Sequence, residues 1–141
     1  MRLPRALRHA GDVADFLTRI RNAIQAAHET VEVPSSKLKK EVARILVEQG
    51  YIKNFEVEAP NADHPGEIIR ISLKYTADRR SAISGLRRVS RPGMRRYVHS
   101  GGVPKVQGGM GTSIVSTSHG VMTGHDARAK GVGGELVAEV W

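Results

Sequence analysis

Apolar residues recur at helical spacing in two segments of the first half of the chain. The first segment follows Asp12, a residue type that suits a helix N-cap, and its stripe comprises Val13, Phe16, Leu17, Ile20, Ile24 and Ala27. The second follows Ser35 and Ser36 and stops at Gly50, and its stripe comprises Leu38, Val42, Ile45 and Leu46. The spacing therefore predicts two amphipathic helices, each with one buried face.

Three short segments around these helices have the alternation or the β-branched composition of strands. They cover residues 30–33, 51–58 and 69–75, and the polar residues 60–66 between the last two predict a turn. We therefore expect residues 12–76 to form an N-terminal α/β domain with two helices and a three-stranded sheet. Residues 77–82 are the candidate linker, and residues 1–11 form a basic N-terminal extension outside this pattern.

Residues 83–141 differ in composition from the first half, with frequent glycine and short apolar runs. Strands are predicted at 86–90, 94–99, 112–117 and 135–140, and a helical turn near 103–106. A short helix is predicted over 126–130, capped by Asp126 and stopped by Gly131. This half is expected to be mainly antiparallel β with one short helix, so the whole chain is predicted to be an α+β protein of two small domains.

The charge of the chain is concentrated in one part of this pattern. The 141 residues carry 22 Lys and Arg against 14 Asp and Glu, which gives a formal charge of +8. Between Arg79 and His125 there are eight Lys or Arg and no acid, so the rest of the chain is neutral in sum. A basic block within folded sequence favours an anionic partner, and nucleic acid above a membrane or an acidic protein. A solvated basic face is the alternative.

Composition also narrows the possible functions. The chain has no Cys, which excludes disulfides and thiolate metal sites, and its histidines show no metal-binding spacing. No apolar run approaches the roughly 20 residues that a membrane span needs. A nuclease would need clustered carboxylates, and the basic block has none. We therefore expect a protein that is not an enzyme and that uses no metal or other cofactor.

Arginines flank an Arg-Pro-Gly turn at residues 91–93. Because a guanidinium donates paired hydrogen bonds to phosphate, a hairpin of this kind would present several phosphate ligands on one face. Tyr97 at its end suits stacking on a base or ordinary packing. The candidate contact residues of this segment are Arg87, Arg88, Ser90, Arg91, Arg95, Arg96 and Tyr97, and Lys105 is a further candidate cation.

A run of hydroxyl residues, Ser116-Thr117-Ser118-His119-Gly120, follows the apolar end of a predicted strand. Such hydroxyls can donate to and accept from base edges and ribose 2′-OH groups. They can also bond to the backbone of their own loop, and composition alone favours this second interpretation. The Gly-rich residues 131–134 lack the Lys and Ser or Thr of a P-loop, so we expect a tight turn there.

Five ordered stretches resemble one known family. They are residues 12–23 (DVADFLTRIRNA), 33–52 (VPSSKLKKEVARILVEQGYI), 87–97 (RRVSRPGMRRY), 116–123 (STSHGVMT) and 131–141 (GVGGELVAEVW). In order and spacing they are similar to the bacterial small-subunit ribosomal protein S8 family. The resemblance implies a structural, RNA-binding constituent of the small ribosomal subunit, located on the ribosome in the cytoplasm. Residues 1–11 lie outside it, and His119 stands where the family usually has Lys.

The resemblance also implies partners and contact residues. The expected partners are the central domain of small-subunit ribosomal RNA, bound early in assembly, and neighbouring small-subunit ribosomal proteins. Binding of messenger RNA off the ribosome, as a translational repressor, stays open as an alternative. In the family, RNA contacts come from the positions that match Ser116, Thr117 and Ser118, and from helix positions that match Thr18, Arg19, Arg21, Asn22, Ser36 and Lys37. Glu135 is expected to support the same C-terminal site.

Overall fold

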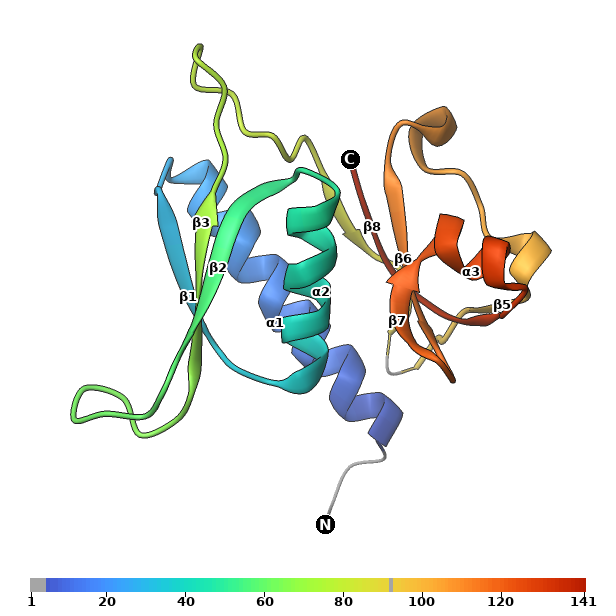
Figure 1. Cartoon of the computed structure of the whole chain (residues 1–141), viewed down its shortest axis with the longest axis horizontal. Helices are drawn as coiled ribbons and strands as arrows, with labels where there is room; N and C mark the ends of the chain where they lie inside the picture. The colour runs from blue at the N-terminus through green and yellow to red at the C-terminus, as the bar shows by residue number, and fades with distance from the viewer. Residues whose placement is uncertain (1–4, 92) are drawn as a thin grey trace.

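The computed structural model describes residues 5–91 and 93–141, with side chains from Val13 onward (Figure 1). Its first half consists of α1 (Arg5–Gln25), β1 (Thr30–Pro34), α2 (Lys37–Glu48), β2 (Ile52–Glu58) and β3 (Ile68–Leu73). Its second half consists of β4 (Leu86–Arg88), β5 (Tyr97–Val98), the 3₁₀ turns η1 (Ser100–Gly102) and η2 (Val106–Gly109), β6 (Thr112–Thr117), β7 (Gly120–Thr123), α3 (Gly124–Lys130) and β8 (Gly134–Val140). None of the helices in these ranges has the length and apolar character needed to cross a membrane.

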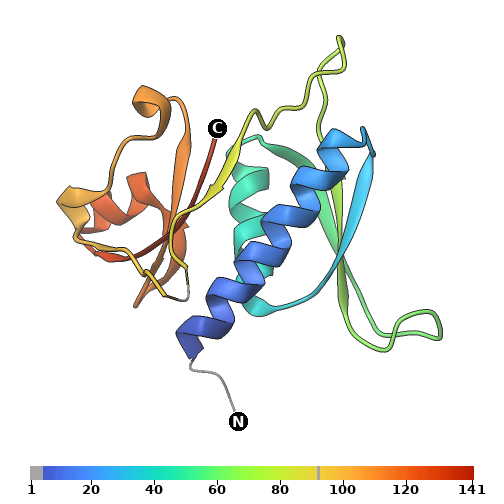
Figure 2. The same cartoon turned by 180° about the vertical axis from the view of Figure 1, so that it is seen from behind.

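The first half is a three-stranded antiparallel sheet, in the order β1-β3-β2, with both long helices on one face (Figures 1 and 2). On the middle strand, Ile69, Ile71 and Leu73 are buried and alternate with half-buried residues, as the strand pattern predicted. The predicted helix over the second apolar stripe is also confirmed. Ser36 caps it by accepting a hydrogen bond from the Lys39 amide, and Gly50 follows its end with a φ of 80°.

The second half is a five-stranded antiparallel sheet in which β8 is the central strand. It pairs with β4, β5 and β6, and β7 extends the sheet from β6. Two glycines allow this dense pairing, since a Cβ on Gly134 would overlap the carbonyl oxygen of Ser116, and one on Gly133 would lie 2.5 Å from the carbonyl oxygen of Val98. The Gly-rich stretch therefore serves close strand approach, and the left-handed residue in it is Gly131, which ends α3 with a φ of 68°.

One hydrophobic core runs through both halves. It joins Phe16 and Ile20 of α1 to the inner face of the first sheet and to Val137 and Val140 of β8 in the second. Figure 2 shows α1 crossing the molecule between the two sheets. A smaller cluster, formed by Val103, Val115 and Leu136, lies inside the second half.

Several sequence-based boundaries are wrong. The first helix begins at Arg5 and not at Asp12, because residues 5–10 include the good helix formers Ala, Leu and Arg and no proline, and the helix continues through Gly11 and Asp12. Thr123 caps α3 by accepting from the Asp126 amide, so Asp126 lies inside that helix. The helical turn expected near 103–106 is replaced by η1 and η2 on either side. The four-residue β7 was not predicted, because it is too short to show a periodic pattern.

We expect Gly134→Ala to lower the free energy of unfolding by about 2 kcal/mol, because the added methyl group meets backbone that cannot move aside without breaking the β6–β8 pairing. The matched control is Gly66→Ala in the β2–β3 loop, where a Cβ would meet nothing within 4 Å. Urea unfolding of both variants measures the difference. Equal midpoints would show that the close approach at Gly134 is not a constraint.

Candidate nucleic-acid interface

The hydroxyl run forms the tight turn between β6 and β7. Thr117 pairs with Gly120 across the hairpin, and Ser118 and His119 lie at its tip. The hydroxyl of Thr117 donates to the Gly120 carbonyl oxygen at 2.8 Å and accepts from the His119 amide at 3.0 Å. Gly120 has a φ of 109°, which suits the glycine that follows a type I turn in such hairpins. The Thr117 hydroxyl thus bonds to its own loop, as composition alone favours, and the RNA contact that the resemblance implies for Thr117 stays a prediction.

The two serines of the run differ from Thr117. Within the described ranges, neither the Ser116 nor the Ser118 hydroxyl has a hydrogen-bond partner, and Ser118 is exposed. Ser116 lies opposite Glu135 of β8, and Glu135 lies opposite Tyr97 of β5. This cross-strand row brings together three predicted residues that are far apart in the sequence. Because paired residues share a face of the sheet, the row combines a hydroxyl, a carboxylate and a phenol ring on one surface.

The side chain of Tyr97 is 67% exposed, so the structure favours a free aromatic face over core packing. Met94, at the turn of the same hairpin, is 72% exposed and was not predicted as a contact residue. The sequence feature that could have identified Met94 is an apolar residue inside an arginine-rich turn. Exposed aromatic and apolar side chains beside cations are the combination on which unpaired bases stack.

The arginine hairpin, residues 87–97, is shorter than the sequence predicts: a bridge between Arg91 and Met94 closes its turn, but β4 and β5 each pair with β8 and not with each other. Internal bonds hold part of this segment. Ser90 is 3% exposed, and its hydroxyl donates to the Leu136 carbonyl oxygen at 2.8 Å and accepts from the Arg96 amide at 3.0 Å. Arg88 donates to the Ser90 carbonyl oxygen at 2.9 Å. Ser90 therefore fixes the hairpin from inside, although the sequence placed it among the contact residues.

The arginines of the hairpin fall into two groups. The guanidinium of Arg87 pairs with Glu139, whose side chain is 6% exposed, and so compensates a buried carboxylate. Arg91, Arg95 and Arg96 form no ion pair among the described residues, which leaves their charge available to an external anion. Lys105 lies elsewhere, between η1 and η2, where it lines a hollow with residues of β6 and α3.

The start of α2 carries the predicted helix contacts Ser36 and Lys37. The Ser36 oxygen accepts from the Lys39 amide at 3.2 Å, so its own proton stays available to an acceptor outside the chain. Lys37 is exposed and forms no ion pair within the described ranges. These two groups, with the amide groups of the first helical turn, form a surface suited to phosphate.

Two neighbouring lysines are paired with carboxylates of the same chain. Lys39 is buried and lies 3.5 Å from a carboxylate oxygen of Asp15. Lys40 pairs with Glu67 at 2.5 Å, and this contact, together with the Ser35 hydroxyl, lowers the pKa of the Glu67 carboxyl. Lys37, Lys39 and Lys40 all stand in the first turn of α2, where the helix dipole is unfavourable for cations, and two of the three have counterions within the chain.

The four predicted contacts on α1 are all exposed: Thr18, Arg19, Arg21 and Asn22. Two of them, Arg19 and Arg21, also form hydrogen bonds within the chain. Arg19 donates to Asp15 at 3.1 Å and to the Glu32 carbonyl oxygen at 3.4 Å. Arg21 donates to the carbonyl oxygen of Leu86, the first residue of β4, and so links α1 to the second half.

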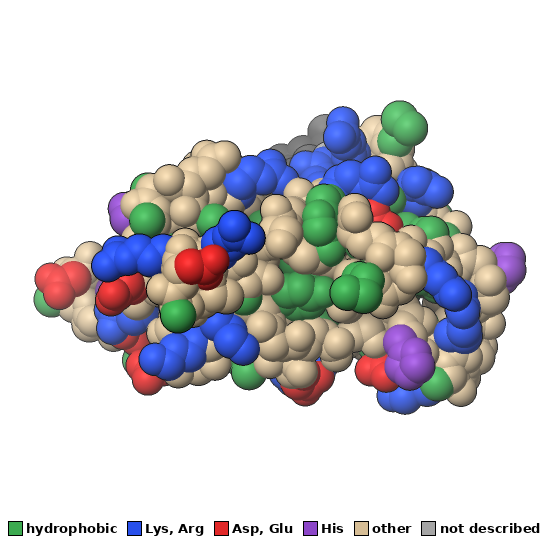
Figure 3. All heavy atoms as spheres, turned by 90° about the horizontal axis from the view of Figure 1, so that it is seen from above, with side chains coloured by type: hydrophobic (Ala, Val, Ile, Leu, Met, Phe, Trp, Pro, Cys, Tyr) green, Lys and Arg blue, Asp and Glu red, His purple; other side chains and the backbone are tan. Residues whose placement is uncertain are grey.

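The main candidate segments lie toward one end of the molecule. In Figures 1 and 2, the start of α2, the arginine hairpin and the β6–β7 turn all lie at the end where α1 begins, whereas η2 and the 76–80 turn lie at the other end. Figure 3, which looks onto that other end, shows a row of Lys and Arg side chains along one margin, and further Lys and Arg intermixed with Asp and Glu over the left part of the view. The arrangement can bind a long anion through several separate contacts.

Comparison with known proteins shows which family the chain resembles. A family model described as ribosomal protein S8 matches residues 11–141. The chain is 52% identical to the small ribosomal subunit protein uS8 of Acetivibrio thermocellus, over 92% of this chain and 96% of that protein. It is 54% identical to the uS8 of Acidobacterium capsulatum and 50% identical to that of a Nocardioides species, with the same coverage of both chains.

The different hydrogen bonding of the turn hydroxyls predicts different effects on stability. Thr117→Val removes two hydrogen bonds of the β6–β7 turn and should lower the free energy of unfolding by about 1 kcal/mol. Ser118→Ala removes an exposed hydroxyl and should change it by less than about 0.5 kcal/mol. Denaturant unfolding of both variants tests this, and a larger loss for Ser118→Ala would refute the assignment of Thr117 as the residue that shapes the turn.

Proposed function

Because the chain belongs to the ribosomal protein S8 family, we propose that it is an RNA-binding constituent of the small ribosomal subunit in the cytoplasm. Proteins of this family are structural components of the ribosome and not enzymes. The finer part of the proposal is that the chain binds the central domain of small-subunit ribosomal RNA directly and thereby supports assembly of the subunit.

The observation that carries the finer proposal is the cross-strand row Tyr97–Glu135–Ser116 next to the β6–β7 turn. Three strands bring these side chains together, Tyr97 is exposed at one end of the row, and the exposed turn residue Ser118 follows β6 shortly after Ser116. Hydroxyls and a carboxylate can read base edges and 2′-OH groups, and the ring of Tyr97 offers a stacking surface. The row carries no cation, so it would contribute selectivity for an RNA shape more than raw affinity.

Affinity would come from the surrounding cations. Arg91, Arg95 and Arg96 form no ion pair among the described residues and lie on the hairpin that leads into Tyr97. Neutralising phosphates with such groups releases counterions, so binding is expected to weaken steeply with salt. We propose that Ser36 and Lys37 at the start of α2 and the exposed groups of α1 form a second contact with the same RNA.

The double variant Ser116→Ala/Ser118→Ala should lose about 1–3 kcal/mol of binding free energy for a transcript of the central domain and little for an unrelated RNA hairpin. The reason is that both hydroxyls lack partners among the described residues and are therefore open to RNA. Filter binding with both RNAs measures the difference. Ser84→Ala, an exposed serine before β4, is the control. An equal loss on both RNAs would argue against selective recognition by the turn.

The double variant Arg91→Ala/Arg95→Ala should weaken binding to both RNAs and reduce the slope of log affinity against log salt by about 1 for each phosphate that the hairpin no longer neutralises. Arg80→Ala is the matched control, because Arg80 belongs to the same basic block but lies in the 76–80 turn, where it pairs with Asp78 at 3.3 Å. An unchanged slope in the double variant, or an equal change in the control, would exclude the hairpin as the phosphate-binding segment.

A further inference from the structure

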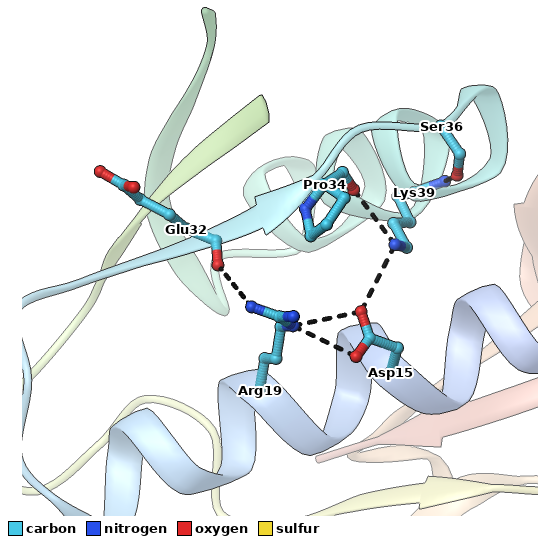
Figure 4. Close-up of polar contacts among 6 residues, drawn as sticks. All are labelled: Asp15, Arg19, Glu32, Pro34, Ser36 and Lys39. Atoms are coloured by element: carbon cyan, nitrogen blue, oxygen red, sulfur yellow. Dashed lines mark hydrogen bonds and ion pairs between the residues drawn. The ribbon is translucent and has the colours of Figure 1, made fainter. Parts of the chain in front are cut away.

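We propose that Asp15 and Lys39 form a positioning pair that holds α1 and α2 in the arrangement in which both helices reach one RNA, a proposal that rests on the function proposed above. Figure 4 shows the pair between the two helices, with Asp15 pointing from α1 and Lys39 from α2. Neither residue was a candidate in the sequence, because a Lys beside other lysines and an Asp near a helix start are typical of solvated surface.

The burial of Lys39 shows that it has an internal role. Its side chain is 6% exposed, in contrast to 40% for the neighbouring Lys40. Its ammonium group donates to the Pro34 carbonyl oxygen at 3.1 Å and to Asp15 at 3.5 Å. A buried ammonium must be compensated, so these two contacts fix the connection from β1 to α2 against α1. Lys39 itself has little surface left for contact with RNA.

Asp15 is shared between two cations. One of its oxygens faces Lys39, and both accept from the Arg19 Nε at 3.1 and 3.2 Å. One carboxylate between two cations leaves one positive charge in the cluster, and Arg19, whose side chain is 46% exposed, is the cation at the surface. The pair therefore orients Arg19 while leaving a net charge that a phosphate can use.

The same pair controls the start of α2. The backbone amide of Lys39 donates to the Ser36 cap, while its side chain reaches back to Pro34, so one residue anchors both sides of the Ser35–Ser36 turn. Lys37 and the Ser36 hydroxyl project from this turn. The Asp15–Lys39 contact therefore sets the distance of Lys37 and the Ser36 hydroxyl from Arg19 across the helix interface. Neither Lys37 nor the Ser36 hydroxyl takes part in that contact.

The test is a double-mutant cycle between Lys37 and Lys39, read as affinity for a central-domain transcript at a temperature where circular dichroism shows every variant folded. Lys37→Ala should lower the affinity about fivefold in the wild-type chain and less than about twofold in Lys39→Met, because a side chain that is no longer positioned contributes little to binding. Lys39→Met alone should also lower the affinity. Arg44→Met, which removes an exposed cation of the same helix, is the matched control and should leave the effect of Lys37→Ala unchanged.

An equal effect of Lys37→Ala in both backgrounds, or wild-type affinity of Lys39→Met, would overturn the proposal, since a purely structural pair changes stability without such coupling. Lys39→Met is expected to fold, because the remaining Asp15 is 43% exposed and still pairs with Arg19. If it does not fold, Asp15→Asn/Lys39→Met replaces it with the same criterion, as it leaves no unpaired buried charge. If the wild-type chain shows no preference for the transcript over an unrelated hairpin, the proposed function fails, whereas a preference without coupling refutes the positioning role alone.

Discussion

Burial of the apolar stripe of α1 against both sheets is the constraint on which the rest of the structure depends. Phe16 and Ile20 are fully buried in a core that includes strands of the first sheet and Val137 and Val140 of β8. Because one helix belongs to both halves, the sheets cannot turn independently without exposing that stripe to water. The hydrogen bond from Arg21 to the Leu86 carbonyl oxygen secures the same junction. A binding surface assembled from both halves thereby has a defined shape before RNA arrives.

The fold divides the cations of the chain into those with internal counterions and those without. The formal charge of +8 predicts an anionic partner, but it does not say which cations meet it. Arg87, Lys39 and Lys40 are compensated by Glu139, Asp15 and Glu67, so they stabilise the fold. Among the described residues, Arg91, Arg95 and Arg96 of the arginine hairpin and Lys37 at the start of α2 are cations that form no ion pair. The cross-strand row between these cations and the β6–β7 turn carries no Lys or Arg, which is why we assign selectivity to it.

Much of the fold could be predicted from local pattern, because alternation and helical spacing report directly on buried faces. The strand over Thr112–Thr117 and the Ser36 cap are examples. The beginning of α1 could not, since a good N-cap residue at position 12 also fits inside a longer helix, and the glycine before it weakens a helix without ending it. Nor could the roles of individual site residues. Ser90 and Ser118 look alike in sequence, but only the pairing of distant strands buries one hydroxyl and exposes the other.

The most direct test of the account is cleavage of bound RNA from single tethered iron probes, which the absence of native Cys makes straightforward. A probe is attached in turn at Ser118→Cys, Lys37→Cys and Asp78→Cys, the last in the exposed 76–80 turn at the opposite end of the molecule. The account predicts local cleavage of a central-domain transcript from positions 118 and 37, at two different places on the RNA, and none from position 78. Cleavage from position 78 alone, or none from position 118, would contradict it.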